Sequence, residues 1–290
     1  MLSRTSLGVI AAAFFGAVLI GAPAIAADEA PAASAHEAPI PPRNDWSFAG
    51  FFGKYDQEQL QRGFQVFREV CSNCHSAKHL AFRNLADPGG PQFSEAQVKA
   101  LAAQYKIKDG PNDAGDMFER PGRPSDYWPW NFANDNAART ANGGGLPPDM
   151  SVLAKARGVK RGFPWFIFEA LPGVAYQEQG ADYIVALMNG YRDNAPAGEK
   201  LDGAQNWNDY FPSHKILMPK PLSDGQITYA DGAPQTAKQY SQDVAAFLMW
   251  MAEPKLDQRK KTGFRVLFVL FILTGLLYAT KKRLWSNVAH

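Results

Sequence analysis

The strongest constraint on this 290-residue chain is its only pair of cysteines, which a histidine follows at once. Cys71, Cys74 and His75 lie in the stretch VCSNCHSAKHL. A C-x-x-C pair can be a redox-active dithiol, half of a metal site, or the attachment point of a larger group. These chemistries need different folds, so the choice between them restricts what the rest of the chain can form.

The surrounding sequence favours haem attachment. A disulfide oxidoreductase places C-x-x-C at a strand-to-helix turn of an α/β fold, and no such pattern precedes Cys71. A zinc site needs a second ligand pair, but there is no further cysteine and the five histidines form no cluster. C-x-x-C-H is the attachment sequence of c-type haem. We therefore predict one haem c, with thioethers to Cys71 and Cys74 and with His75 as an iron ligand.

The residues alone do not determine which side chain is the sixth ligand of the iron. His79 follows His75 by four positions, on the same side of the haem, and cannot reach the opposite face. Met249 and Met251 fall in an amphipathic segment, where core packing is the simpler interpretation. Met218 lies in the proline-rich stretch YFPSHKILMPKPLSD, where it is either a distal ligand or a residue that anchors the loop. His/Met ligation would suit electron transfer, because it raises the reduction potential relative to two histidines.

The N-terminus indicates export. Residues 1–26 combine a basic start, an apolar run and small residues at Ala24 and Ala26, which is typical of a cleaved signal peptide rather than a membrane anchor. Residues 27–45 are rich in alanine and proline, and we expect a disordered leader there.

The C-terminus predicts a membrane span. Residues 263–285 would form a helix of roughly 30 Å, the thickness of one bilayer core. Basic residues flank both ends, so their distribution alone does not fix the orientation. The signal peptide does: we expect residues 46–258 in the periplasm, residues 259–285 in and beside the inner membrane, and residues 286–290 in the cytoplasm.

The charge of the exported part differs from that of the whole chain. Once the ends are set aside, 25 basic residues face 28 acidic ones, a net charge of −3 rather than +2. Acidic residues recur at 109, 113, 116 and 119, in either a solvated loop or a docking surface for a basic partner. No basic stripe indicates nucleic acid.

Hydrophobic spacing and turn residues predict a mostly α protein with long loops. Residues 84–149 are dense in turn signals, and we expect them to be irregular apart from one short helix. The expected helices are 56–70 capped by Asp56, a short one near 94–104, 151–157 capped by Asp149, 181–190 closed by Gly190, and 236–252 stopped by Pro254. Residues 227–236 contain a turn and a possible small hairpin. Gly63 should let helix 56–70 cross helix 236–252 close to Phe247 or Trp250.

At this point the chain resembles the cytochrome c1 family, the haem c subunits of quinol–cytochrome c oxidoreductase (the cytochrome bc1 complex). The resemblance runs from about Trp46 to Trp285. It rests on the motifs QRGFQVFREVCSNCH, DGPNDAGDMFERPGRPSDY, ANGGGLPPDMSVLAKAR, DYFPSHKILMPKPL and DVAAFLMWMAEPKLDQRKKTG.

The resemblance implies a fold and a function. The exported part would be a class I cytochrome c-like haem domain, in a dimeric complex with cytochrome b and the Rieske iron–sulfur protein. It would pass single electrons from the Rieske protein to a soluble cytochrome c, with no substrate chemistry on this chain alone. The alternatives are a free-standing, membrane-tethered cytochrome that serves a terminal oxidase, and a haem enzyme such as a peroxidase.

The resemblance also implies roles for single residues. Met218 would ligate the iron opposite His75, and Arg157 would pair with a haem propionate. The remaining implied positions are a haem-edge loop of Asn142, Leu146, Pro147 and Pro148, Tyr183 near the propionates, and a pocket wall of Phe211 and Pro221. The chain departs from the family pattern by an insert at 158–180, whose aromatic residues form either local core or a partner site, and by Pro219-Lys220 after the methionine.

Overall fold

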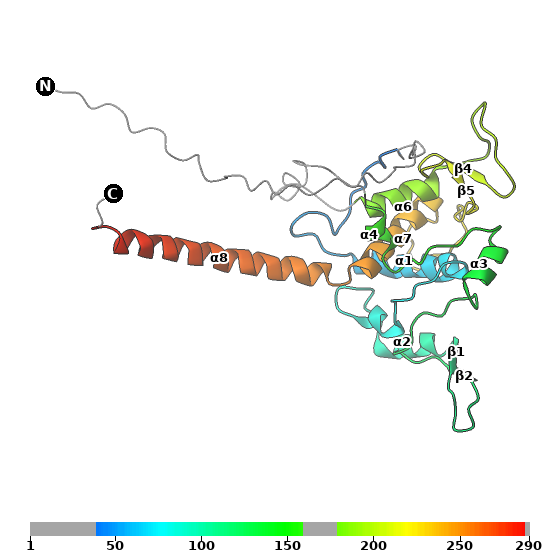
Figure 1. Cartoon of the computed structure of the whole chain (residues 1–290), viewed down its shortest axis with the longest axis horizontal. Helices are drawn as coiled ribbons and strands as arrows, with labels where there is room; N and C mark the ends of the chain where they lie inside the picture. The colour runs from blue at the N-terminus through cyan, green and yellow to red at the C-terminus, as the bar shows by residue number, and fades with distance from the viewer. Residues whose placement is uncertain (1–38, 159–178, 288–290) are drawn as a thin grey trace, which may run out of the picture. The chain divides into compact units, whose positions relative to one another are not determined.

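The computed structural model describes residues 39–158 and 179–287 (Figure 1). The predicted signal peptide, most of the predicted leader, the centre of the 158–180 insert and the last three residues lie outside these ranges. The predictions for those segments therefore stay predictions.

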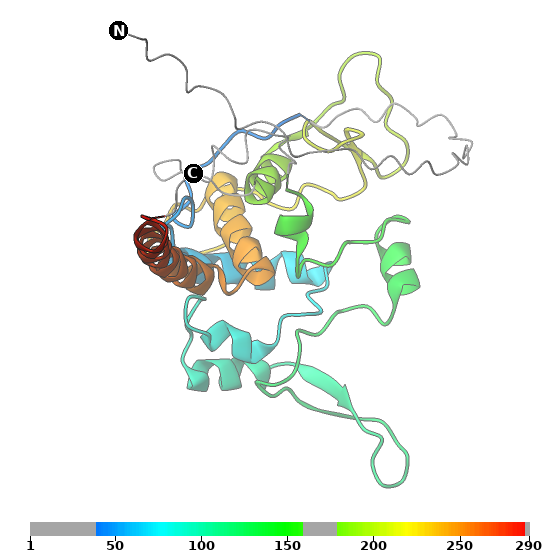
Figure 2. The same cartoon turned by 60° about the vertical axis from the view of Figure 1, so that its left-hand side comes forward.

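The described part is mostly helical, as predicted, with two small sheets (Figures 1 and 2). The α-helices are α1 (Gln57–Glu69), α2 (Glu95–Ala102), α3 (Asp135–Ala141), α4 (Leu153–Ala156), α6 (Gly180–Asn189), α7 (Ala237–Ala252) and α8 (Leu256–Leu284). Two 3-10 helices cover Cys71–Asn73 and Phe82–Ala86. Strands β1 (Lys106–Asp109) and β2 (Phe118–Pro121) pair antiparallel, and β3 (Tyr191–Arg192), β4 (Asn206–Asn208) and β5 (Lys215–Ile216) form a second antiparallel sheet in that order.

The core forms where α1 crosses α7. Leu60, Phe64 and Phe67 recur at helical spacing on α1 and are buried against α7. Gly63 lies at the closest approach, because a Cβ atom added there would be 2.1 Å from the Asp243 carbonyl oxygen and 2.7 Å from the Phe247 Cβ. The predicted approach of Gly63 to Phe247 is thus confirmed, whereas Trp250 faces a different glycine, Gly90.

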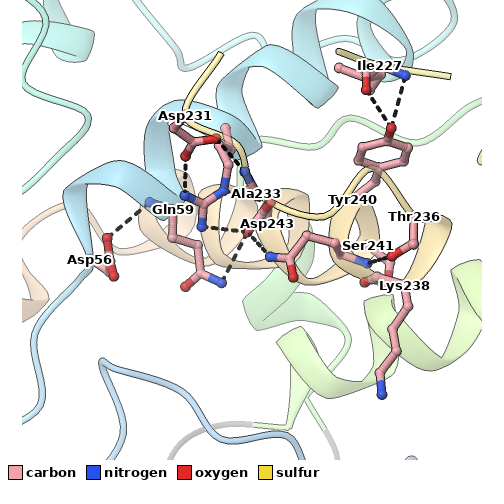
Figure 3. Close-up of polar contacts among 12 residues, drawn as sticks. Asp56, Gln59, Ile227, Asp231, Ala233, Thr236, Lys238, Tyr240, Ser241 and Asp243 are labelled. Atoms are coloured by element: carbon pink, nitrogen blue, oxygen red, sulfur yellow. Dashed lines mark hydrogen bonds and ion pairs between the residues drawn. The ribbon is translucent and has the colours of Figure 1, made fainter. Parts of the chain in front are cut away.

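A buried carboxylate joins the same two helices. The Asp243 side chain on α7 is fully buried and faces α1 (Figure 3). It accepts hydrogen bonds from Arg62 (Nε, 3.0 Å), Gln59 (Nε2, 3.3 Å) and Gln239 (Nε2, 2.9 Å). Arg62 also pairs with Asp231 at 2.7 Å. The charge of Asp243 is therefore compensated inside the core, which makes its burial tolerable.

Helix α8 has the length and composition of a membrane-spanning segment. Its apolar stretch is long enough to cross a bilayer, and none of it is buried in the protein, unlike a core helix. The helix begins at Leu256 rather than near residue 263, since Pro254 is the last helix-breaking residue before it.

The predicted cap at Asp56 and the predicted helix end at Gly190 are confirmed, and Ser94 and Thr236 are further caps that were not predicted. Asp56, Ser94 and Thr236 cap α1, α2 and α7 by accepting a backbone hydrogen bond, and Gly190 ends α6. The prediction that Asp149 caps a helix is wrong: α4 starts at Leu153 with no side-chain cap.

Two further predictions need correction. Residues 84–149 hold the β1–β2 pair and α3 besides the expected short helix. Residues 227–236 form turns without strands, because the backbone of Ile227 bonds to the Tyr240 hydroxyl instead of a second strand.

Candidate functional site

The C-x-x-C-H motif forms one tight turn at the C-terminal end of α1. The amides of Cys74 and His75 both donate to the Cys71 carbonyl, at 3.2 and 2.9 Å. The two residues between the cysteines satisfy the last carbonyls of α1, since Ser72 Oγ donates to Arg68 O and Asn73 Nδ2 donates to Glu69 O, both at 2.9 Å. The helix end therefore places both thiols and the imidazole on one turn of the chain.

A second segment holds this turn from the other side. Trp130 Nε1 donates to Cys74 O at 3.0 Å, and Asn131 Nδ2 donates to Ser72 O at 3.2 Å. The Lys78 ammonium lies 5.6 Å from the centroid of the Trp130 ring. The motif is thus held by contacts from two separate segments of the chain.

Cys71 and Cys74 form no disulfide, and the Cys71 thiol does not have the electrostatics of a redox dithiol. Burial, and then the neighbouring Cys74, raise the pKa of the Cys71 thiol to about 12. Reactive dithiols have lowered thiol pKa values instead. The raised pKa of Cys71 argues against the oxidoreductase alternative. The turn therefore offers two cysteines that are not paired with each other.

His75 is 8% exposed and is oriented by the loop that contains Pro148. Its Nδ1 lies 2.8 Å from the Pro148 carbonyl oxygen, which can only accept a hydrogen bond. Nδ1 therefore carries the proton, and Nε2 keeps a free lone pair. Burial lowers the pKa of His75 despite the opposing effects of Pro148 and Asp149, which keeps the ring neutral, as a metal ligand must be.

Asp149 holds this loop in place. Its carboxylate accepts from Ser76 Oγ at 2.7 Å, from the Lys78 amide at 2.9 Å and from the Ser151 amide at 2.9 Å. The Met150 amide also donates to Ser76 O at 2.8 Å. Asp149 thus ties the segment after His75 to the segment after Pro148, the role it has in place of the predicted cap.

Met218 is half-buried and belongs to a segment held by the β3–β4–β5 sheet. Its carbonyl accepts a hydrogen bond from Tyr191 Oη at 3.1 Å and lies 3.5 Å from Asn206 Nδ2. The loop after α3 reaches the same segment, because a Cβ on Gly145 would lie 3.1 Å from the Leu217 side chain. The structure thus brings the predicted haem-edge loop and the Met218 segment together.

Arg157 and Tyr183 are also brought together. Arg157 ends α4 and is exposed, and Tyr183 is half-buried on α6. Burial raises the pKa of Tyr183, and the charge of Arg157 lowers it in part. Burial and the adjacent Tyr183 raise the pKa of Tyr191. Tyr183 is therefore near enough to Arg157 and to Tyr191 for electrostatic interaction, and Tyr191 bonds to the carbonyl of Met218.

The other predicted residues lie at the end of α3, in the loop after it, and in the loops that follow β4 and β5. Asn142 caps α3 by donating to Ala138 O at 2.7 Å. The Phe211 amide bonds to the Asn208 side chain at 3.2 Å, in the turn between β4 and β5. Leu146, Pro147 and Pro221 are half-buried.

Other methionine and histidine side chains of the described residues have different surroundings. Met249 and Met251 are buried in the core, as expected, and Met150 joins them. His214 stacks on Trp207 with ring centroids 5.0 Å apart. Met117 is exposed on the turn between β1 and β2.

Comparison with known proteins decides the family. The family model described as the Cytochrome C1 family matches residues 46–288. The chain belongs to the cytochrome c1 family. It is 49% identical over 250 residues to cytochrome c1 of Blastochloris viridis and 47% identical over 264 residues to that of Rhodospirillum rubrum, covering 86% of this chain and 87% and 88% of those proteins. It is 58% identical over 247 residues to cytochrome b/c1 of Bradyrhizobium diazoefficiens, covering 85% of this chain but only 36% of that longer protein.

Membership of the cytochrome c1 family makes the chain an electron-transfer subunit of the cytochrome bc1 complex, and the free-standing carrier is not favoured. The family implies a haem c cofactor. The residues present fit such a group, because one turn offers two unpaired thiols and a neutral imidazole with Nε2 free.

Sequence reasoning missed several residues that build this site. Trp130 and Asn131 hold the motif, and Tyr191 and Gly145 position the Met218 segment. The glycine run in NGGGLPP could have indicated that the chain packs closely against another segment there, as Gly145 does. Nothing in the sequence pointed to the partner of Tyr191.

Proposed function

We propose that this chain carries one haem c, bound through thioethers to Cys71 and Cys74, and passes single electrons from a Rieske iron–sulfur protein to a soluble cytochrome c. The hydrogen bond between His75 and Pro148 O carries the proposal, since it leaves one imidazole nitrogen free for an iron at the attachment turn. When bound, haem c supplies the one-electron couple.

The residues of the chain have separate tasks in this proposal. His75 and Met218 would hold the haem iron, and Tyr191 holds the methionine segment through the Met218 carbonyl. Arg157 supplies a positive charge for a propionate, with Tyr183 beside it. The loop of Asn142, Leu146, Pro147 and Pro148 forms the haem edge, and Phe211 and Pro221 line the methionine side. Rigid ligands keep the reorganisation on electron transfer small.

The partners follow from the family and from charge. Cytochrome b and the Rieske protein are the expected membrane partners, in a dimeric complex. Asp113 and Asp116 are exposed on the turn between β1 and β2, which supports a basic soluble cytochrome c as the acceptor. The haem domain lies in the periplasm, and the C-terminal end of α8 faces the cytoplasm across the inner membrane.

Substitution of the methionine ligand tests the iron site. Met218→Leu should lower the midpoint potential and let the reduced protein bind carbon monoxide, because the iron loses its sixth ligand. Met188→Leu is the matched control, since Met188 is also half-buried but packs against the core. If the Met218 variant keeps the wild-type potential and excludes carbon monoxide, the ligand assignment is wrong.

Purification from native membranes in mild detergent tests the partners. A tag after His290 should bring down haem b and an iron–sulfur protein together with haem c, and quinol should reduce that haem c. If haem c arrives alone and quinol does not reduce it, the chain is a tethered carrier rather than a subunit.

A further inference from the structure

A short aromatic loop lies beside the first turns of the membrane anchor. This 48–55 loop, drawn in blue, reaches the start of α8 in both views (Figures 1 and 2). The rings of Phe51 and Phe52 have centroids 5.0 Å apart, and they lie 6.0 and 5.6 Å from the ring of Phe264 on α8. Phe52 is 70% exposed and Phe264 is 47% exposed. The three rings thus form an apolar patch open to the surroundings.

Polar contacts, rather than this patch, fix the loop to the anchor. Lys260 Nζ donates to Phe48 O at 2.6 Å and to Gly53 O at 3.2 Å. The Tyr55 amide donates to Asp257 Oδ1 at 3.3 Å. Asp257, Lys260 and Phe264 recur at three and four residues and share one face of α8. These hydrogen bonds therefore hold the loop beside the first turns of α8, whether or not the rings of Phe51 and Phe52 add to the attachment.

The loop also has little freedom of its own. Gly50 has a φ of +69°, and a Cβ on Gly53 would lie 2.0 Å from Ala49 O. The Tyr55 hydroxyl contacts the carbonyl oxygens of Met249 and Glu253 at 3.2 Å, at the end of α7. A tight loop bound at both ends presents Phe51 and Phe52 at a defined position, at the level where α8 becomes apolar.

Exposed rings at this level fit the boundary between lipid headgroups and acyl chains, where aromatic side chains concentrate. The patch is continuous with the exposed apolar surface of α8. Lys54 follows the two rings in the chain, and Lys261 and Arg265 adjoin Lys260 and Phe264 on α8; all three are exposed, and their charges suit phosphate groups.

We propose that the 48–55 loop is a second membrane contact, in which Phe51 and Phe52 enter the lipid of the leaflet beside the haem domain. A single helix alone would let the domain tilt on the membrane. Contact at two points fixes its orientation, and with it the direction in which the haem site faces. This inference depends on the membrane anchor and not on the ligands of the iron.

A photo-crosslinker at position 52 tests the proposal in native membranes with all partner subunits present. The variant is Phe52→p-benzoylphenylalanine, a larger aromatic side chain at a position that is already mostly exposed. The same replacement at Met117 is the matched control, because Met117 is 64% exposed on the turn between β1 and β2. After illumination, the intact mass of the purified chain and a denaturing gel report what each position touches. The haem c spectrum of each variant confirms that the domain has folded.

The proposal expects the chain with the crosslinker at 52 to gain the mass of one phospholipid, and the control at 117 to gain none. A crosslink from 52 to another polypeptide would overturn it, since the patch would then be a protein interface. The absence of any adduct at 52 would also overturn it, because the rings would then face water. Equal lipid adducts at both positions would mean non-specific reaction, and would overturn it as well.

Discussion

Replacement of Gly63 by alanine tests the contact on which the core depends. The added Cβ would lie 2.1 Å from the Asp243 carbonyl oxygen and 2.7 Å from the Phe247 Cβ. Carbon and oxygen atoms in close contact normally stay about 3.3 Å apart, so α1 and α7 must separate by about 1 Å. The obstacle is helix backbone, which cannot rotate away as a side-chain end could.

The cost follows from two opposing effects. Overpacking a tight core costs about 1–3 kcal/mol, and an obstacle in the backbone argues for the upper end of that range. Alanine in place of glycine returns about 1 kcal/mol through its higher helix propensity. The net destabilisation is about 2 kcal/mol. For a domain of this size, that lowers the melting temperature by about 4–8 °C.

The assay is thermal unfolding of the full-length protein in detergent, followed by circular dichroism. Gly263→Ala is the control, because it makes the same exchange in a helix where nothing lies within 4 Å of the new Cβ. We expect that variant to melt at or slightly above the wild-type temperature. If Gly63→Ala also melts there, the close approach of α1 and α7 does not limit the stability of the core.

Two further predictions concern a surface ion pair and the methionine segment. The Arg120 side chain, bonded to Asp126 at 2.6 and 2.9 Å, holds the pKa of Asp126 down to about 2 from its usual 3.8. The pair stabilises the folded state above the usual pKa and loses this effect as the pH falls toward 2. Asp126→Asn should therefore flatten the decline of the melting temperature between about pH 4 and pH 2, and an unchanged decline would contradict this. Tyr191→Phe removes the hydrogen bond to Met218 O, and we expect a loss of about 1 kcal/mol in the free energy of unfolding. A redox titration should give a midpoint potential between those of the wild type and Met218→Leu, and a wild-type value would mean that Tyr191 does not position the ligand.

The sequence predicted the elements of the site better than their arrangement. Cys71, Cys74 and His75 form the expected turn at the end of α1. The orientation of His75, however, depends on the Pro148 carbonyl, 73 positions away. No side-chain pattern indicates which backbone carbonyl will face a given imidazole, because every residue carries the same acceptor.

The errors have a common physical cause. Asp149 has the right identity for a helix cap, but the Ser76 hydroxyl and the Lys78 amide competed for its carboxylate once the chain had folded. The β1–β2 pair was missed because its strands are short and bury almost no side chain, so they carry no alternating pattern.

By itself, the sequence determined the features that depend on neighbours along the chain. These are the attachment turn, the capped helices α1, α2 and α7, and the apolar length of α8, all set within a few turns of backbone. Only the tertiary structure decided which distant groups meet: Pro148 at His75, Tyr191 at Met218, and the 48–55 loop at α8 across more than 200 residues. Such contacts form between groups that any loop could supply, and it is the crossing of α1 over α7 that brings these particular loops together.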